Sequence, residues 1–362
     1  MICSSLILQI IRLVFNIYVS NRVTPEALGV FSLIMVTYMF GITLASSGIN
    51  ITCMRVVSEE YALGNDLGVK KSSRRCITIS LLFAVIASFI FYINSDFIVK
   101  YCFENKVSES IVYLICIALP LISVSSAITG YFTAVRRVYK PVIGQFLEQI
   151  SKIVATIILF KYLGANNSLQ NICFILILGD VISEIVSFVF LSIVYFFDIN
   201  YHFSTLKSKE NQKFLFRIFR ILLPISATSC IKSGISSFKQ IIIPSSLQKN
   251  GKNLDEALSD YGIISGMAMP IVMFPATFLI AVSGLLIPEF SRYYVKEDYN
   301  KIKLYTDKLI TGAFLFASVL TIFFLIFGDN LGFAIYHNLE ARTIYQTFLL
   351  AYTFYVCRYN YR

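Results

Sequence analysis

The sequence predicts an all-α polytopic membrane protein built on the two-lobe bundle plan of a transporter. Of its 362 residues, 57% are hydrophobic and only 14% are charged, whereas about a quarter of the residues in soluble domains are charged. Apolar runs of about 20 residues recur along the chain, and a helix of that length crosses roughly 30 Å of hydrocarbon. The positive charge lies mainly in alternate connecting segments, as in multi-pass membrane proteins.

The apolar runs define the expected helices. We expect about ten transmembrane segments, each bounded by polar or helix-breaking residues. The expected segments are 2–20, 28–54, 76–94, 110–134, 141–161, 171–197, 214–246, 261–290, 309–327 and 340–357.

Lysine and arginine alternate along the loops. One set of loops holds 18 of them: 55–75, 136–140, 207–220 and 292–308. The loops between these hold 7: 21–27, 95–109, 161–170, 247–260 and 328–342. The positive-inside rule then places the N-terminus and the basic loops on the cytoplasmic side of the cell membrane. The net charge of +10 is therefore explained by the orientation of the chain in the membrane, and we expect no nucleic-acid partner.

The polar stretch 198–213 divides the predicted bundle. Residues 1–197 form an N-terminal lobe of six helices, 198–213 a cytoplasmic linker, and 214–362 a partial C-terminal lobe of about four helices. Gly29-Val30-Phe31-Ser32 and Gly262-Ile263-Ile264-Ser265 open one helix in each lobe, which favours a parallel internal repeat. The second lobe is shorter than such a repeat requires, so we expect a truncated or frame-shifted chain, or a naturally shorter protein.

Cations inside predicted membrane helices are the first candidate site residues. An ionisable side chain in mid-membrane costs about 2.5–3.5 kcal/mol on insertion scales, so it usually faces a partner or a water-filled cavity. Arg12, Lys232 and Lys239 are such residues, and Arg55 lies near a helix end where it can reach the interface. Together they predict a cationic cavity for an anionic, phosphate-bearing substrate. The alternative is a set of charges that pair and lock helices together.

The fifth and sixth predicted helices carry a second polar set. Glu148 and Lys152 are four residues apart and share a helix face, where they can neutralise each other. Asp180 and Glu184 repeat that spacing. We expect these residues to line a polar cavity or to couple transport to an ion: Gln145, Glu148, Gln149, Lys152, Asp180 and Glu184.

Motifs of catalysis and metal binding are missing from the sequence. No phosphate-binding loop, catalytic triad or paired-carboxylate site is recognisable, which disfavours an enzyme or an ATP-driven pump. The eight cysteines are scattered singly and the two histidines are isolated, so we expect no metal site. We expect no cofactor, with transport coupled to sodium, protons or the membrane potential.

One run of residues resembles a known family signature. Gly130-Tyr131-Phe132, Pro141, Gln145, Glu148-Gln149 and Lys152 resemble the GYF…P…SQ-x-x-EQ-x-x-R signature of the stage V sporulation protein B-like oligosaccharide flippases. These belong to the multidrug/oligosaccharidyl-lipid/polysaccharide exporter superfamily. Leu223-Pro224-Ile225-Ser226 also resembles the start of that family's second lobe, whereas Lys152 stands where the family usually has arginine.

The resemblance implies a V-shaped bundle that works by alternating access. The implied substrate is an undecaprenyl-pyrophosphate-linked saccharide, a precursor of peptidoglycan or polysaccharide, and for the sporulation branch of the family the implied role is supply of precursor for the spore cortex. Arg12 stands at the position of a family arginine associated with the pyrophosphate. The implied partners are this lipid-linked saccharide and membrane lipids. The alternatives are a cation-coupled drug exporter, in which Asp180 and Glu184 bind sodium or protons, and a non-transporting membrane scaffold.

Overall fold

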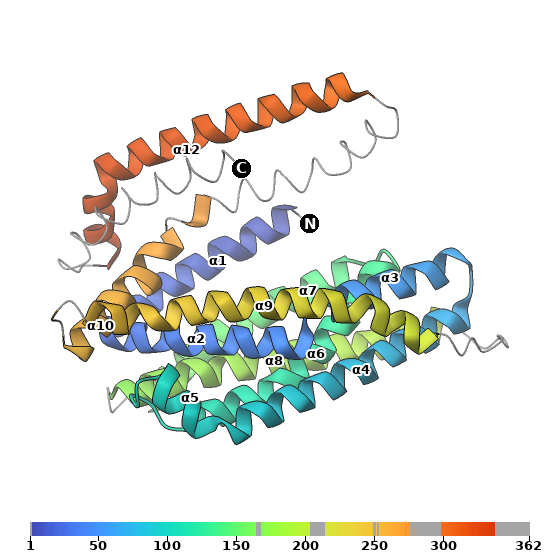
Figure 1. Cartoon of the computed structure of the whole chain (residues 1–362), viewed down its shortest axis with the longest axis horizontal. Helices are drawn as coiled ribbons and strands as arrows, with labels where there is room; N and C mark the ends of the chain where they lie inside the picture. The colour runs from blue at the N-terminus through green and yellow to red at the C-terminus, as the bar shows by residue number, and fades with distance from the viewer. Residues whose placement is uncertain are drawn as a thin grey trace. The chain divides into compact units, whose positions relative to one another are not determined.

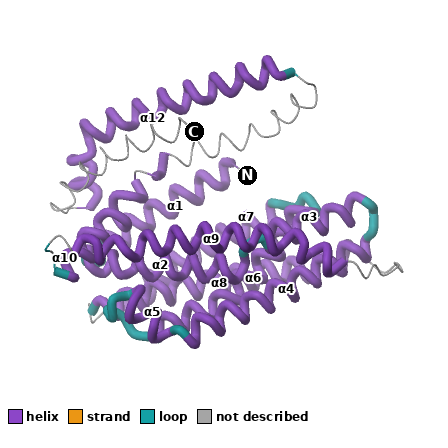
Figure 2. The backbone as a smooth tube through the Cα atoms, in the orientation of Figure 1, coloured by secondary structure: helices purple, strands orange, loops and turns teal. Residues whose placement is uncertain are grey.

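The computed structural model describes residues 2–163, 168–202, 214–248, 251, 253–271, 273–275 and 298–336. All regular structure in these residues is helical (Figure 2). Seven helices among them are long and apolar enough to cross a membrane, which confirms the predicted all-α polytopic class. The count of ten and the truncated second lobe stay predictions. Residues 276–290 of the expected segment 261–290, and all of the expected segment 340–357, lie outside the described residues.

The chain groups into two compact units. One consists of residues 1–29 and 255–362, and the other of residues 30–254. The predicted division into lobes at 198–213 stays a prediction, because 203–213 lie outside the described residues.

Antiparallel helices form the 30–254 unit (Figure 1). They are α2 (Pro25–Ser46), α3 (Ile49–Ala62), α4 (Asp66–Ile93), α5 (Ser95–Cys102), α6 (Ser110–Ala134), α7 (Tyr139–Leu163), α8 (Leu169–His202) and α9 (Phe214–Gln248). Their connections alternate between two ends of the unit. We call the basic end the one formed by the start of α4, the α6–α7 corner at 135–138 and the last turn of α8. The opposite end contains α5, the last turn of α7 and the first turn of α8.

Helix α6 lies at the centre of this unit, in contact with α3, α4 and α8. Its large apolar side chains are fully buried, among them Ile111, Ile115 and Leu119. Buried serines link it to its neighbours: Ser123 Oγ donates to the backbone oxygen of Ala45 at 2.7 Å. Apolar burial alone drives little association within lipid, so close packing and such hydrogen bonds hold the helices together.

A glycine breaks the long span 25–62 into α2 and α3. Gly48 has φ +75°, a left-handed conformation that glycine adopts without steric cost. Side-chain atoms of Ser226 and Ile225 on α9 leave little room for a Cβ there, at 3.0 Å and 3.2 Å. Ser226 Oγ donates to the backbone oxygen of Ser47 at 2.7 Å. A residue of the Leu223–Ser226 motif therefore supplies a hydrogen bond to a backbone carbonyl at the break between α2 and α3.

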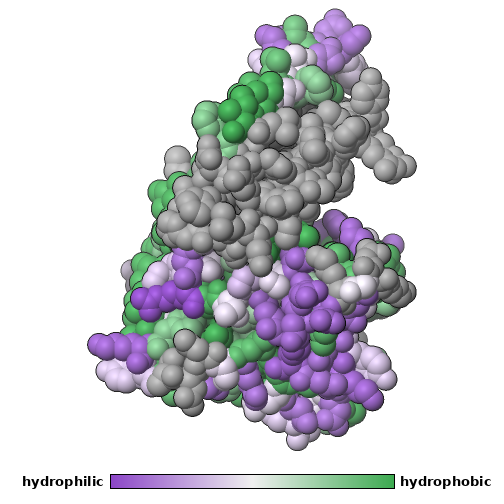
Figure 3. Space-filling view, turned by 90° about the vertical axis from the view of Figure 1, so that its left-hand side faces the viewer, coloured by the Kyte–Doolittle hydropathy of each residue, from purple (hydrophilic) through white to green (hydrophobic). Residues whose placement is uncertain are grey.

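Apolar side chains also cover the outside of the bundle. On α4, Leu82, Ile86 and Phe89 are more than half exposed, as expected for a face that meets lipid tails rather than water. Figure 3 looks onto the end opposite the basic end, where hydrophilic surface gathers. The exposed polar residues there include Asn94, Asp96, Lys100, Asn105, Lys161 and Ser168.

The other unit contains α1 (Ile2–Ser20), α10 (Leu254–Gly262), the π-helix η1 (Ile263–Ala268) and α12 (Tyr299–Tyr336). The two glycines of the repeated sequence motif meet here. A Cβ on Gly29 would overlap the backbone oxygen of Leu258, and a Cβ on Gly262 would overlap that of Pro25. Only glycine allows this close approach of backbones.

The π-helix η1 is supported by side chains from two other helices. A π-helical turn disturbs the regular backbone hydrogen bonds of an α-helix, and it often occurs at functional positions. Ser20 Oγ donates to the backbone oxygen of Gly266 at 3.4 Å, and Tyr336 Oη donates to that of Met267 at 3.0 Å. These bonds tie η1 to α1 and α12.

Candidate functional site in the helical bundle

Helices α7 and α8 form an ion pair within the apolar bundle. Lys152 Nζ donates to Asp180 Oδ1, and the two side chains are 26% and 7% exposed. Glycine makes this approach possible, because a Cβ on Gly179 would lie 2.5 Å from Thr156 Oγ1. The sequence predicted neutralisation of Lys152 by Glu148 on its own helix, and the structure adds Asp180 as a partner from α8.

Two more carboxylates surround this ion pair. Glu148 and Asp180 lie within electrostatic range of Glu184, as does Lys152. Tyr38 of α2 lies near Glu148, Asp180 and Glu184. We call these five residues the acidic cluster: Tyr38, Glu148, Lys152, Asp180 and Glu184. It contains three carboxylates and one ammonium group in a poorly solvated place, where ionised groups are costly.

One carboxylate oxygen of the acidic cluster has no hydrogen-bond partner among the described residues. Asp180 Oδ2 is buried and makes no hydrogen bond to any described residue, which is costly for a charged oxygen. No group of three or more His, Cys, Asp or Glu side chains able to hold a metal ion occurs among the described residues. Of the two predicted glutamines, Gln149 is buried and Gln145 is exposed.

The candidate cations lie on the exposed faces of their helices. Lys232 and Lys239 are exposed on α9, and their spacing of seven residues puts them on one side of that helix. Arg12 is exposed on α1, in the other unit. Arg55 forms a surface ion pair with Glu59 at 3.4 Å, with 63% of its side chain exposed, so it has an acidic partner on its own helix.

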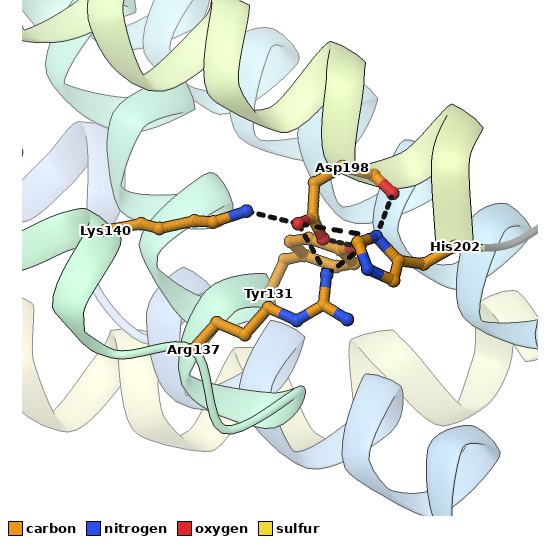
Figure 4. Close-up of polar contacts among 5 residues, drawn as sticks. All are labelled: Tyr131, Arg137, Lys140, Asp198 and His202. Carbon is orange, nitrogen blue, oxygen red and sulfur yellow. Dashed lines mark hydrogen bonds and ion pairs between the residues drawn. The ribbon is translucent and has the colours of Figure 1, made fainter.

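A second ionic cluster closes the basic end, and its anionic centre was missed from the sequence (Figure 4). Asp198 on α8 has a fully buried side chain. It accepts hydrogen bonds from Tyr131 Oη at 2.8 Å, from Arg137 Nη1 at 2.5 Å and from Lys140 Nζ. The sequence pattern places Asp198 in the linker that begins at residue 198, whereas in the structure α8 continues to His202. The sequence signal that could have identified Asp198 is its position: it is an acidic residue directly after a long apolar run, at a basic end of the bundle.

His202 extends this cluster by one helical turn. Its Nδ1 lies 2.9 Å from Arg137 Nη1, and guanidinium can only donate, so Nδ1 accepts that hydrogen bond. The same nitrogen is 3.3 Å from the backbone oxygen of Asp198. Together, Tyr131, Arg137, Lys140, Asp198 and His202 fasten the α6–α7 corner to the end of α8.

An antiparallel helical bundle with ionic clusters inside its apolar body is the architecture of a multi-pass membrane protein. Its fold is that of the multidrug resistance MATE transporters of the MOP superfamily. An inward-facing structure of such a transporter matches with a TM-score of 0.67 and 16% identity, over 95% of this chain and 76% of that one. A MOP superfamily transporter from Pyrococcus furiosus Vc1 matches with a TM-score of 0.63 and 14% identity, over 97% and 76%.

The chain belongs to the polysaccharide biosynthesis protein family, whose sequence model matches residues 1–294. It is 21% identical to stage V sporulation protein B of Bacillus subtilis (strain 168) over 336 residues, covering 91% of this chain and 64% of that protein. It is 19% identical to sporulation protein YkvU of the same organism over 296 residues, covering 81% and 64%. The chain therefore spans about two thirds of the length of these relatives.

Proposed function

We propose that the protein is a flippase that moves an undecaprenyl-pyrophosphate-linked saccharide across the cytoplasmic membrane by alternating access. The observation that supports this most strongly is family membership over residues 1–294, combined with similarity to stage V sporulation protein B. That similarity also favours supply of a precursor for spore-cortex peptidoglycan.

Exposed cations in membrane helices support an anionic substrate. Lys232 and Lys239 form no ion pair within the described residues, and both are exposed in the span 218–248. Exposure to lipid would cost each lysine about 2.5–3.5 kcal/mol, so exposure to a hydrated cavity is the arrangement of lower free energy. Arg12, exposed on α1, is the proposed pyrophosphate contact, because a guanidinium can bind phosphate oxygens in bidentate fashion.

The test is translocation of a lipid-linked saccharide in proteoliposomes that contain the full chain. We expect Arg12→Ala to abolish flipping while membrane insertion is retained, and Arg12→Lys to retain part of the rate. Lys161→Ala, which removes an exposed cation at the opposite end of the 30–254 unit, is the matched control and should flip normally. Normal flipping by Arg12→Ala would refute the assignment.

The acidic cluster is the proposed coupling site. Its three carboxylates outnumber its one ammonium group, and Asp180 Oδ2 has no hydrogen-bond partner among the described residues, so binding and release of a proton or small cation there would shift the balance between conformations. Sodium, protons or the membrane potential can each supply this energy.

The same charge balance favours a second candidate, a cation-coupled drug exporter of the same superfamily. Drug efflux would require Glu184 as flipping does, but it would not require a pyrophosphate. Expression should then confer drug resistance without any effect on envelope polymers. Resistance that disappears in Glu184→Gln, together with absent flipping, would select this candidate over the flippase.

A further inference from the structure

The tip of the α6–α7 corner has an unusual backbone conformation. Helix α6 ends with hydrogen bonds from Arg137 N–H to the Phe132 oxygen at 2.8 Å and from Arg136 N–H to the Thr133 oxygen at 3.2 Å. This pair defines a Schellman motif, in which the residue at the Arg136 position takes a left-handed conformation and is usually glycine. Arg136 has φ +61°, which is sterically unfavourable for a residue with a Cβ.

The three cations of the corner differ in what they face. Arg137 and Lys140 turn inward onto Asp198. Arg136 is exposed and forms no ion pair with any described residue. A strained conformation persists only where surrounding structure or function maintains it. Glycine would adopt this conformation without steric cost, so the arginine side chain is a candidate for a binding role.

Other exposed cations lie at the basic end with Arg136. Lys70 Nζ donates to Asn200 Oδ1 at 3.3 Å, which places the start of α4 beside the last turn of α8, where the Asp198 cluster also lies. The next residues of α4 include the exposed cations Lys71 and Arg74. The buried carboxylate of Asp198 is already shared by two cations. Arg136, Lys71 and Arg74 are thus exposed cations at the same end of the unit.

The corner also has the sequence features of a membrane interface. It directly follows the apolar span 110–134, and Tyr139, three residues after Arg136, is 61% exposed. Exposed tyrosines at the ends of membrane helices lie at the interface between hydrocarbon and headgroups. We propose that Arg136 binds the phosphate of an anionic phospholipid headgroup, with Lys71 and Arg74 adding attraction from α4.

The test measures how phosphatidylglycerol, compared with phosphatidylcholine, raises the apparent melting temperature of the full chain in detergent. Wild type should gain more from phosphatidylglycerol, and the gain should shrink at high salt because exposed charges are screened. In Arg136→Gly the apparent affinity for phosphatidylglycerol should fall about five-fold, the effect of one basic residue near an anionic surface. The same variant should melt about 2 °C higher in neutral detergent, since glycine removes the backbone strain.

Companion variants separate charge from conformation. Arg136→Gln keeps the strained backbone and should lose the lipid preference, whereas Arg136→Lys should keep it. Lys161→Gln at the opposite end is the matched control and should behave as wild type. An unchanged preference for phosphatidylglycerol in both Arg136→Gly and Arg136→Gln would overturn the proposal. Stabilisation by polyglutamate but not by phosphatidylglycerol would also overturn it, in favour of an acidic protein partner.

Discussion

Asp198 shows how one buried carboxylate can organise the end of a membrane bundle. Its side chain has no exposed surface and accepts bonds from a phenol, a guanidinium and an ammonium group. Charged donors give stronger hydrogen bonds than neutral ones, and their removal would leave buried charge unsatisfied. This residue therefore connects the family-signature tyrosine, Tyr131, with the basic corner.

Neutralising Asp198 should leave Arg137 and Lys140 without their shared anionic partner at the basic end. We expect Asp198→Asn to lower the free energy of unfolding by about 3 kcal/mol, the lower part of the range for breaking a buried ion pair. Tyr131→Phe should cost about 1.5 kcal/mol, the value of one hydrogen bond to a charged group. Thermal unfolding in detergent measures both. Equal stability of Asp198→Asn and wild type would contradict this role.

The ion pair between Lys152 and Asp180 should behave as a coupled unit. We expect Lys152→Met to lower the free energy of unfolding by about 3 kcal/mol, because a buried carboxylate loses its cation. Adding Asp180→Asn should restore most of that loss, since both charges are then gone. The checks are the amount of protein in the membrane and its melting temperature. A double variant less stable than Lys152→Met would show that the pair is not coupled.

Glycine matters to whole elements where the first residues of α2 (25–29) cross α10, both within the unit formed by 1–29 and 255–362. Gly29 opens α2 against Leu258, and Gly262 ends α10 against Pro25. The two positions belong to similar sequence motifs, and the structure brings these motifs into contact. A side chain at either glycine would push the helix backbones apart.

Substitution at this crossing should be more damaging than at an open glycine. We expect Gly262→Ala to lower the free energy of unfolding by about 1–3 kcal/mol, the usual cost of overpacking. Gly312→Ala in α12 is the matched control, since nothing lies within 4 Å of its Cβ position, and it should gain about 0.5–1 kcal/mol from helix propensity. Thermal unfolding of the two variants side by side measures the difference, and equal effects would show that the crossing tolerates a methyl group.

At the scale of the whole molecule, the alternating basic loops predict the orientation in the membrane. The start of α4 and the α6–α7 corner lie at the same end of the 30–254 unit (Figure 1). This agrees with the alternation that assigns both to the cytoplasm.

Labelling of single cysteines checks this orientation. In a variant without its native cysteines, Val138→Cys should resist a membrane-impermeant maleimide in intact cells, whereas Tyr162→Cys should react. The two residues lie near opposite ends of α7. Permeabilisation should make the first position reactive and serves as the control. The reverse labelling pattern would invert the topology.

The sequence alone determined the class of the protein, the family resemblance and most helix positions in residues 1–248. Apolar runs long enough to span hydrocarbon need no tertiary information, because lipid requires every backbone group to be satisfied within the helix. The expected runs at 110–134 and 141–161 correspond to α6 and α7, at 110–134 and 139–163. The Glu148 and Asp180 sets were also identified, because charge in an apolar run is conspicuous.

Tertiary structure decided which charges meet. Helix spacing favoured Lys152 with Glu148, whereas the approach of α7 and α8 at Gly179 adds Asp180. Asp198 is a second example. The sequence pattern makes it the start of a polar linker, whereas in the structure it belongs to α8 and contacts the α6–α7 corner. Sequence periodicity describes one helix at a time, and pairing between helices depends on rotation and close contact that only the packed bundle provides.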